Sequence, residues 1–171
     1  MKNTLVKTLL ATLACALYIP LQAATITVSS NLDSGSGCTL RKAIAKINTA
    51  GVAVNDCSSI GSFGNEDTIN LLLPTNSKIS LLSSGIDLTE SMEITTQSEG
   101  ITIEPKSGEV VFTIGQENQI VDVTLRNLTF TNASREDMNG GAIVINQPLT
   151  TVKVENSSFT SNYARLGSGI Y

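Results

Sequence analysis

Two eleven-residue stretches, VTLRNLTFTNA at residues 123–133 and VKVENSSFTSN at residues 152–162, decide the fold of this chain. They align at an offset of 29 residues, and identical residues recur at four aligned positions: Val123 with Val152, Asn127 with Asn156, Phe130 with Phe159 and Thr131 with Thr160. Within the first copy, apolar residues alternate with polar ones on both sides of two adjacent polar residues. Alternation at a period of two is typical of strands. A repeat of this length that contains short strands favours a parallel β-helix, in which each repeat is one coil.

The two polar residues in the middle of the repeat predict a corner between two faces of the coil. Val123 and Leu125 alternate inward before Arg126 and Asn127, and the inward alternation resumes at Leu128. Asparagine tolerates the left-handed backbone that such corners use. In stacked coils we expect Asn127 and Asn156 to lie above one another, where their side-chain amides can form a ladder.

The remainder of residues 67–171 shows the same short alternation and no helical stripe. The runs are Ile69/Leu71, Ile79/Leu81, Ile86/Leu88, Ile101/Ile103 and Val121/Val123/Leu125. By themselves such runs also fit a sandwich or a barrel, and a chance alignment of two copies is the alternative to a true repeat. The repeat favours a parallel β-helix over a sandwich or a barrel, and we therefore predict an all-β fold with a parallel β-helix at residues 67–171. A partial third match, at an offset of 28, places Gly140–Ile143 opposite Ser168–Tyr171.

The first 23 residues predict a secretory signal peptide. Lys2 and Lys7 precede an apolar run from Leu9 to Leu21, and Ala23 is a small residue at the expected cleavage site. Acylation at Cys15 is an alternative that the apolar residues after it disfavour. Removal of the leader leaves a net charge of −6 without a basic cluster, which argues against nucleic acid as a partner. We expect no membrane-spanning segment in the mature chain.

Between the leader and the repeats, the pattern predicts a strand at 24–30 and then one helix. The apolar residues Leu40, Ala43, Ile44 and Ile47 lie at three- and four-residue spacing. Thr39 is the expected N-cap, and Gly51 stands where the helix ends. Arg41, Lys42 and Lys46 occupy the opposite face, which we expect to be solvated.

Cys38 and Cys57 are the two cysteines that remain after removal of the leader. In an exported protein an even count favours one disulfide, and two free buried thiols are the alternative. A metal site is not expected, because the chain has no histidine and two thiolates do not complete a zinc shell. We therefore expect no cofactor.

Two sets of motifs resemble known bacterial families. Cys38–Ala43, CTLRKA, resembles the motif that names the CSLREA domain, a short module that follows the signal peptide of exported bacterial proteins. The resemblance continues to Asp67-Thr68-Ile69 and covers about residues 25–72, with Thr39 for Ser and Lys42 for Glu as departures. It implies a cap at 24–66. Physically, a disulfide-clipped helix at this place would cover the open first coil of the β-helix.

The second half resembles the repeats of polymorphic outer-membrane proteins, which are right-handed parallel β-helices of bacterial surfaces. Gly140–Ile143 matches their Gly-Gly-Ala-Ile tetrapeptide, and Phe159–Asn162 matches their Phe-x-x-Asn tetrapeptide. In the earlier copy, Phe130–Ala133, the asparagine stands one place early. This resemblance implies an outer-membrane, cell-surface or extracellular location. The chain stops inside an expected strand, and we interpret it as truncated at the C-terminus, either the first part of a longer passenger or a shortened product.

Catalytic groups are few. Without histidine, triad chemistry and most zinc hydrolase designs are excluded. The candidates for a lyase are Arg135, Glu136 and Asp137, or Arg126 with Asp122. The aligned positions do not repeat acids, and Arg126 opposite Glu155 predicts a surface ion pair. Glu66 and Asp67 with Asn65 suggest Ca²⁺, but Asp67 fits better as a cap of the turn into the next strand.

The leading hypothesis is therefore a secreted or cell-surface β-helix without catalysis, which interacts with host cells, matrix or glycans as an adhesin. The alternative is a carbohydrate-active β-helix enzyme, above all a polysaccharide lyase, and a truncated remnant without a role of its own is the third. Three or more carboxylates with an Arg or Lys on one side of the coils would favour the lyase. A ladder of Asn, Ser and Thr would favour the adhesin.

Overall fold

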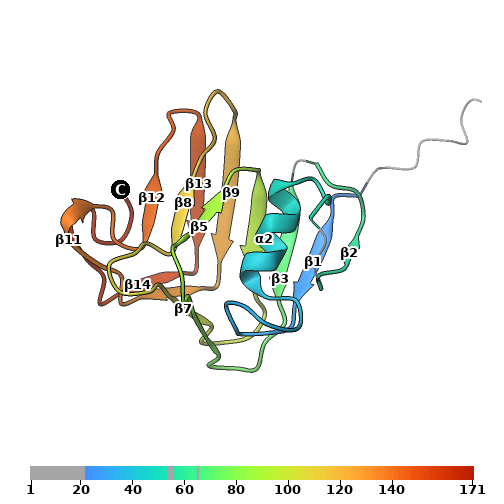
Figure 1. Ribbon diagram of the computed structural model, residues 1–171, viewed down its shortest axis with the longest axis horizontal. Helices are drawn as coiled ribbons and strands as arrows, with labels where there is room; N and C mark the ends of the chain where they lie inside the picture. Colours follow the sequence, from blue (N-terminus) through green and yellow to red (C-terminus); the bar gives the residue numbers. More distant parts are fainter. Residues whose placement is uncertain (1–21, 54–55, 65) are drawn as a thin grey trace, which may run out of the picture.

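The computed structural model describes residues 22–53, 56–64 and 66–171, so most of the expected signal peptide lies outside the described residues. Strands stack into a solenoid of about 3 turns, with one short helix and a disulfide near the N-terminus (Figure 1). The predicted fold class, an all-β parallel β-helix with a helix-containing, disulfide-clipped start, is confirmed.

The coils form two longer sheets and two shorter ones. The six-stranded sheet has the order β13 (Thr150–Glu155), β9 (Val121–Arg126), β6 (Met92–Thr95), β3 (Asp67–Leu71), β1 (Thr25–Val28) and β2 (Ser59–Ile60). The four-stranded sheet has the order β14 (Ser158–Thr160), β10 (Thr129–Thr131), β7 (Thr102–Glu104) and β4 (Lys78–Ser80). The third holds β12 (Ile143–Ile145), β8 (Phe112–Ile114) and β5 (Ile86–Leu88), and β11 (Ser134–Asn139) pairs with β15 (Tyr163–Leu166). All these pairs are parallel except β1 with β2.

The register of the final coils confirms the 29-residue repeat. Val123 pairs with Val152 and Phe130 with Phe159. The predicted offset of 28 for the glycine motif is wrong, because Ile143 pairs with Ile170 and not with Tyr171. The offset between the two coils becomes shorter within β11, because the register of β11 against β15 shifts between Arg135 and Asn139.

The core is a set of stacked columns of inward side chains. One column contains Ile26, Ile69, Ile94 and Leu125, none of which is solvent-accessible. A second column stacks Phe130 on Phe159, with ring centroids 5.1 Å apart. Phe112, which lies on β8 of another sheet, meets Phe130 edge-on at 5.9 Å. Full burial of one such side chain contributes roughly 1.5–3 kcal/mol, so each inward residue that the stacked coils bury stabilises the fold.

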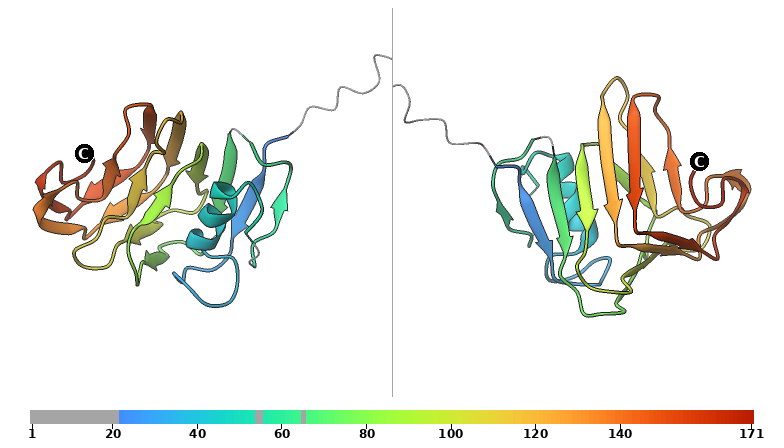
Figure 2. Two further views of the ribbon diagram at one scale, coloured as in Figure 1. Left: turned by 45° about the horizontal axis from the view of Figure 1, so that its top comes forward. Right: turned by 180° about the vertical axis from the view of Figure 1, so that it is seen from behind.

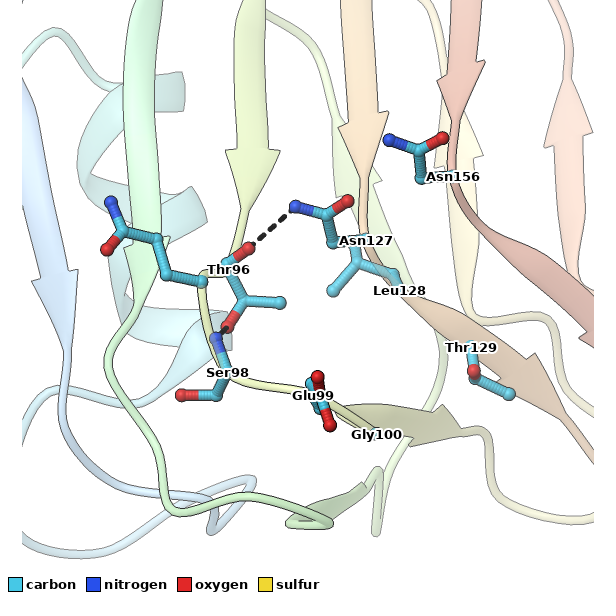
Figure 3. Close-up of a pocket in the computed structure, with 9 residues that line it drawn as sticks. Thr96, Ser98, Glu99, Gly100, Asn127, Leu128, Thr129 and Asn156 are labelled. Atoms are coloured by element: carbon cyan, nitrogen blue, oxygen red, sulfur yellow. Dashed lines mark hydrogen bonds between the residues drawn. The ribbon is translucent and has the colours of Figure 1, made fainter.

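Both Asn127 and Asn156 have left-handed backbones, with φ of 61° and 48°, as the predicted corner requires. The side-chain bonding differs from the expected ladder of amides. The Asn127 amide donates to the main-chain carbonyl of Thr96 on the coil below, at 2.8 Å (Figure 3). The Asn127 corner is therefore held by a side chain bonded to the backbone of a neighbouring coil.

The helix α2 (Leu40–Asn48) confirms the predicted stripe, because Leu40, Ala43, Ile44 and Ile47 are its buried residues. Thr39 is the N-cap, and its hydroxyl accepts the Lys42 N–H. Gly51, with φ of 85°, donates its N–H to the carbonyl of Lys46 after the helix ends. The helix contacts β1, β3 and β5 and so covers the interior at the N-terminal end of the solenoid (Figures 1 and 2).

The prediction that the charged side of α2 is simply solvated is wrong, because all three cations are half-buried and bonded. Arg41 forms an ion pair with the buried Asp33, Nε to Oδ1 at 2.7 Å, and donates to the carbonyls of Ser84 and Gly85. Lys42 pairs with Asp56. Lys46 donates to the carbonyl of Cys57. The basic side chains of the helix thus bind the loops around it and the first coil.

The disulfide Cys38–Cys57 is confirmed and lies beside α2, with both cysteines buried. β1 pairs with β3 in parallel, and the cap and the coils share one hydrophobic core. The division of the chain at residue 67 stays a prediction.

Candidate functional site

The outer face of the four-stranded sheet carries two columns of small polar side chains. The outward residues are Lys78, Thr102, Thr129 and Ser158 in one column and Ser80, Glu104, Thr131 and Thr160 in the other. The hydroxyls of neighbouring coils bond to each other: Thr129 Oγ1 lies 3.0 Å from Ser158 Oγ, and Thr160 Oγ1 donates to Thr131 Oγ1 at 3.1 Å. We call these four residues, together with Thr102, the hydroxyl face.

On the N-terminal side of the hydroxyl face, one carboxylate, that of Glu104, is bound by several neighbouring side chains. Lys78 Nζ lies 2.9 Å from Glu104 Oε1, and Ser80 and Asn132 also donate to that carboxylate. The hydrogen bond from Lys78, followed by that from Ser80, holds the pKa of Glu104 below its usual value. Glu104 is thus an ionised anchor rather than a proton donor.

A shallow hollow of about 380 Å³ lies at the corner between the two longer sheets (Figure 3). It is lined by Thr96, Gln97, Ser98, Glu99, Gly100, Asn127, Leu128, Thr129 and Asn156. Asn127 and Asn156 are exposed and point from successive coils toward this hollow, which adjoins the hydroxyl face at Thr129. The hollow therefore extends a surface made of amides and hydroxyls.

The outer face of the six-stranded sheet carries charges instead. Arg126 lies between two glutamates of neighbouring coils, with its Nε 3.1 Å from Glu93 Oε1 and its Nη1 in contact with Glu155. The predicted Arg126–Glu155 ion pair is confirmed. Glu155 also binds Lys153, whose hydrogen bond, assisted by the charge of Arg126, lowers the pKa of Glu155. Each of the two carboxylates is thus paired with a cation on this face.

A wider hollow of about 780 Å³ on this face contains Glu66, Glu93 and Asp122. Within residues 22–53, 56–64 and 66–171, no group of three His, Cys, Asp or Glu side chains is placed to hold a metal ion. Of the calcium candidates, Asn65 lies outside the described residues. The Asp67 carboxylate is buried and accepts the N–H groups of Ala24 and Gly64, which is the capping function that the sequence favours.

The loop candidates for catalysis lie in the irregular part of β11. Arg135 donates to the carbonyls of Asn139 and Gly140 and thus folds the loop on itself. Glu136 and Asp137 are exposed. This loop belongs to the β11–β15 sheet, whereas Asp122 and Arg126 lie on β9 of the six-stranded sheet. The two candidate sets do not share a sheet.

The glycines of the repeat motif allow two coils to approach closely. Gly140 has a φ of +77°, and a side chain on Gly141 would meet the carbonyl oxygen of Ser168 at 1.8 Å. Asn162 of the Phe-x-x-Asn motif accepts the Ala133 N–H and donates to the Phe130 carbonyl, both at 3.0 Å. These motif residues join neighbouring coils.

Sequence reasoning missed two polar residues that the coils bury, Asp33 and Thr96. Among their partners, Leu82 and Leu71 are 49 and 25 residues away in the chain, so the burial of these side chains depends on contacts between coils. Sequence reasoning also missed the hydroxyl face, although the alternation of Thr129 and Thr131 with the inward Phe130 marks the outward positions of β10 and could have located it.

The chain matches no protein-family model, no curated protein and no solved structure. Among the described residues, no helix has the length and the apolar character that a membrane crossing requires.

Proposed function

We propose that this chain is an exported, non-catalytic β-helix that binds glycans of host cells or extracellular matrix through its hydroxyl face. The observation that carries this proposal is the pair of hydroxyl–hydroxyl contacts between β10 and β14, Thr129 with Ser158 and Thr131 with Thr160. A ladder of this kind is the feature expected of an adhesin surface.

The chemistry of a hydroxyl ladder suits polar, uncharged ligands. Each hydroxyl carries one donor and two acceptor lone pairs, so a contact between two hydroxyls leaves most of this capacity available. Neighbouring strands repeat these groups at about 4.8 Å. A glycan presents a similar alternation of donors and acceptors, and shallow binding to such a face is independent of formal charge.

The lyase alternative is supported by one observation, the presence of Glu93, Asp122 and Glu155 with Arg126 on one side of the coils. The environments of these groups favour binding over catalysis. A carboxyl that acts as a general acid needs a raised pKa, whereas the pKa of Glu155 is lowered by Lys153 and Arg126. Arg126 is engaged by two glutamates and is not left as a base.

Binding to a panel of immobilised glycans and matrix proteins tests the proposal. The variant T131V/T160V removes two hydroxyls and keeps β-branched shape, so we expect at least a tenfold loss of affinity, about 1.4 kcal/mol, with an unchanged fold. The matched control T124V/T151V makes the same change on the outer face of the six-stranded sheet. Equal binding by all three proteins, or a loss in the control only, contradicts the proposal.

An enzymatic assay tests the alternative directly. Incubation with polygalacturonate and Ca²⁺ is expected to release no unsaturated sugar. Turnover that Arg126→Gln abolishes would establish the lyase and overturn the non-catalytic part of the proposal.

The proposed location rests on the lysines and apolar run of residues 1–23 and on the resemblance of Cys38–Ala43 to the CSLREA motif. The resemblance of Gly140–Ile143 to polymorphic outer-membrane repeats supports a bacterial surface. Expression of the full chain in a Gram-negative host, followed by fractionation and N-terminal sequencing, tests it. We expect an exported protein that begins at Ala24, and an uncleaved cytoplasmic chain contradicts the proposal.

A further inference from the structure

Two carboxylates are buried in the described part of the chain, and their bonding differs. Asp33 and Asp67 are 4% and 1% exposed, and Asp33 is paired with Arg41. Asp67 accepts main-chain N–H groups only, from Ala24 to Oδ1 at 2.9 Å and from Gly64 to Oδ2 at 3.2 Å. Among the described residues, no Lys or Arg forms an ion pair with Asp67. A buried carboxylate without a cation is costly to the folded state.

The nearer of the two donors to Asp67 is the residue at which the mature chain is proposed to begin. Hydrolysis of the Ala23–Ala24 peptide bond by a signal peptidase consumes one water and breaks the C–N bond. The products are the carboxylate of Ala23 and the α-amino group of Ala24, which is largely protonated at neutral pH. Processing therefore converts the amide N–H that contacts Asp67 into an ammonium.

The position of the Ala24 nitrogen is fixed by contacts that remain after processing. Ala24 is fully buried, and its carbonyl accepts the Thr68 N–H at 2.8 Å. From Thr25 onward, β1 pairs in parallel with β3, whose first residue is Asp67 (Figure 1). The new ammonium is therefore held beside the Asp67 carboxylate by the pairing of these two strands.

Processing also removes two residues that contact the cap. The Gln22 carbonyl accepts the Ser62 N–H at 2.9 Å, and Ala23 forms a bridge with Ser62. Cleavage removes these contacts and opens the space beside Ala24 to water. The ammonium can thus keep one N–H on Asp67 while water hydrates the other two.

We infer that Asp67 is the counter-ion of the α-ammonium that cleavage between Ala23 and Ala24 creates. Removal of the leader then completes an ion pair between the start of β1 and the start of β3. A hydrogen bond between two charged groups is roughly twice as strong as one between neutral groups, so the processed chain gains a contact that the unprocessed chain lacks. This inference rests on the export and the cleavage point of the proposed function.

A double-mutant cycle on the exported protein tests the pair. In the matched control, one glycine is inserted between Ala23 and Ala24, which restores an amide at Ala24 and moves the ammonium one residue away. N-terminal sequencing establishes where each mature chain begins. In urea denaturation, D67N should lower the folding equilibrium constant at least tenfold more in the chain that begins at Ala24 than in the glycine control.

Glu66, which is exposed beside Asp67, provides the control for a nearby surface charge. E66Q should change the folding equilibrium constant by the same factor in both chains. Equal losses from D67N in the two chains, or a larger difference for E66Q than for D67N, overturn the inference and leave the proposed export unaffected. A mature chain that begins at another residue overturns both the inference and the proposed cleavage point.

Acylation of the α-amino group tests the pair without any substitution at Asp67, and so holds even if D67N does not fold. Only the unprotonated amine reacts, and an adjacent carboxylate favours the protonated form. At neutral pH, the folded chain that begins at Ala24 should react at this amine at least tenfold more slowly than the glycine control, with the lysines of each chain as the internal reference. Equal rates in the two chains overturn the inference.

Discussion

The two ends of this solenoid differ in how far they cover the backbone groups and the apolar side chains that an outermost coil exposes. At the N-terminal end, side chains bond the backbone groups that an outermost coil exposes: Asn31 to Lys78, Arg41 to Gly85, and Asn48 to Asp87 and Thr89. At the C-terminal end, Val152, Val154 and Phe159 remain half-exposed, and within the described residues β13 and β14 each pair with one strand, β9 and β10. A short helix can therefore cover the end of a parallel β-helix, because its side chains bond backbone groups that a further strand would otherwise pair.

The largest effect is expected from removal of the clip that holds the cap. The disulfide closes a segment of 19 residues, and a loop of this size stabilises the folded state by about 3 kcal/mol through the entropy of the unfolded chain. We expect the double variant C38S/C57S to lose that amount in urea denaturation, and reductant to have the same effect on the unmodified protein. A loss below about 1 kcal/mol would mean that the helix holds the cap end without the disulfide.

The next effect distinguishes the two ends by pH. Burial of Asp33 raises its pKa, but the bonds from Arg41 and from the Leu82 N–H outweigh burial, and the folded-state pKa lies below the ordinary 3.8. The stabilisation by Asp33 is therefore complete above the ordinary pKa and is lost as the pH falls through the folded value. Asp33→Asn should lose about 2 kcal/mol at neutral pH and show a flatter acid limb in denaturation curves.

Glu155→Gln is the matched control at the open end, since the pKa of Glu155 is also lowered but its side chain lies at the surface. We expect it to lose less stability than Asp33→Asn at neutral pH, because its ion pairs are partly exposed and screened, and this loss should fade as the pH falls through the folded-state pKa of Glu155. A larger loss for Glu155→Gln than for Asp33→Asn would reverse the assignment of the two ends.

The sequence predicts the regular parts of this fold because their signals are local. The stripe of α2 and its Thr39 cap lie within a single nine-residue helix and the residue before it. The 29-residue repeat is visible because the last two coils keep one offset through β13 and β14. Earlier coils vary: Ile69 pairs with Ile94 at an offset of 25, and Ile94 with Leu125 at 31. Turns of unequal length hide those repeats from self-alignment.

The contacts of Arg41 are harder to predict from the sequence. Its partners Asp33, Ser84 and Gly85 belong to a loop and to a coil more than 40 residues away. A basic residue on the polar side of a helix is usually solvated, and only the stacking of the first coil over α2 changes this environment. The same reason explains why the predicted offset at Gly140–Ile143 is wrong, since the extra residues in β11 precede the motif.

A smaller effect is expected at the corner that joins the last two coils. Asn162→Ala removes two hydrogen bonds and leaves the Ala133 N–H and the Phe130 carbonyl without them, which should cost about 1 kcal/mol in a denaturation experiment. Asn156→Gly is the control, because glycine tolerates the φ of 48° at this exposed corner. If Asn156→Gly, at the corner between β13 and β14, is the more destabilised, the last coil depends more on the backbone conformation of that corner than on the Asn162 bonds between β14 and β15.

The smallest effect is expected for Arg126→Gln on the charged face. Its ion pairs with Glu93 and Glu155 are partly exposed and screened by salt. We expect a decrease in melting temperature that is smaller than that of Asn162→Ala and that disappears at high ionic strength. An effect that persists in high salt would show that Arg126 contributes through packing.

Native-state hydrogen exchange tests the asymmetry of the two ends most directly. In dilute, monomeric protein, we expect the amides of β3 and β6, next to the cap, to exchange only through global unfolding. The amides of β13 and β14 should exchange faster through local opening, because their coil is covered on one side only. Equal protection of β3 and β13, or stronger protection of β13, would contradict the account of a covered and an open end.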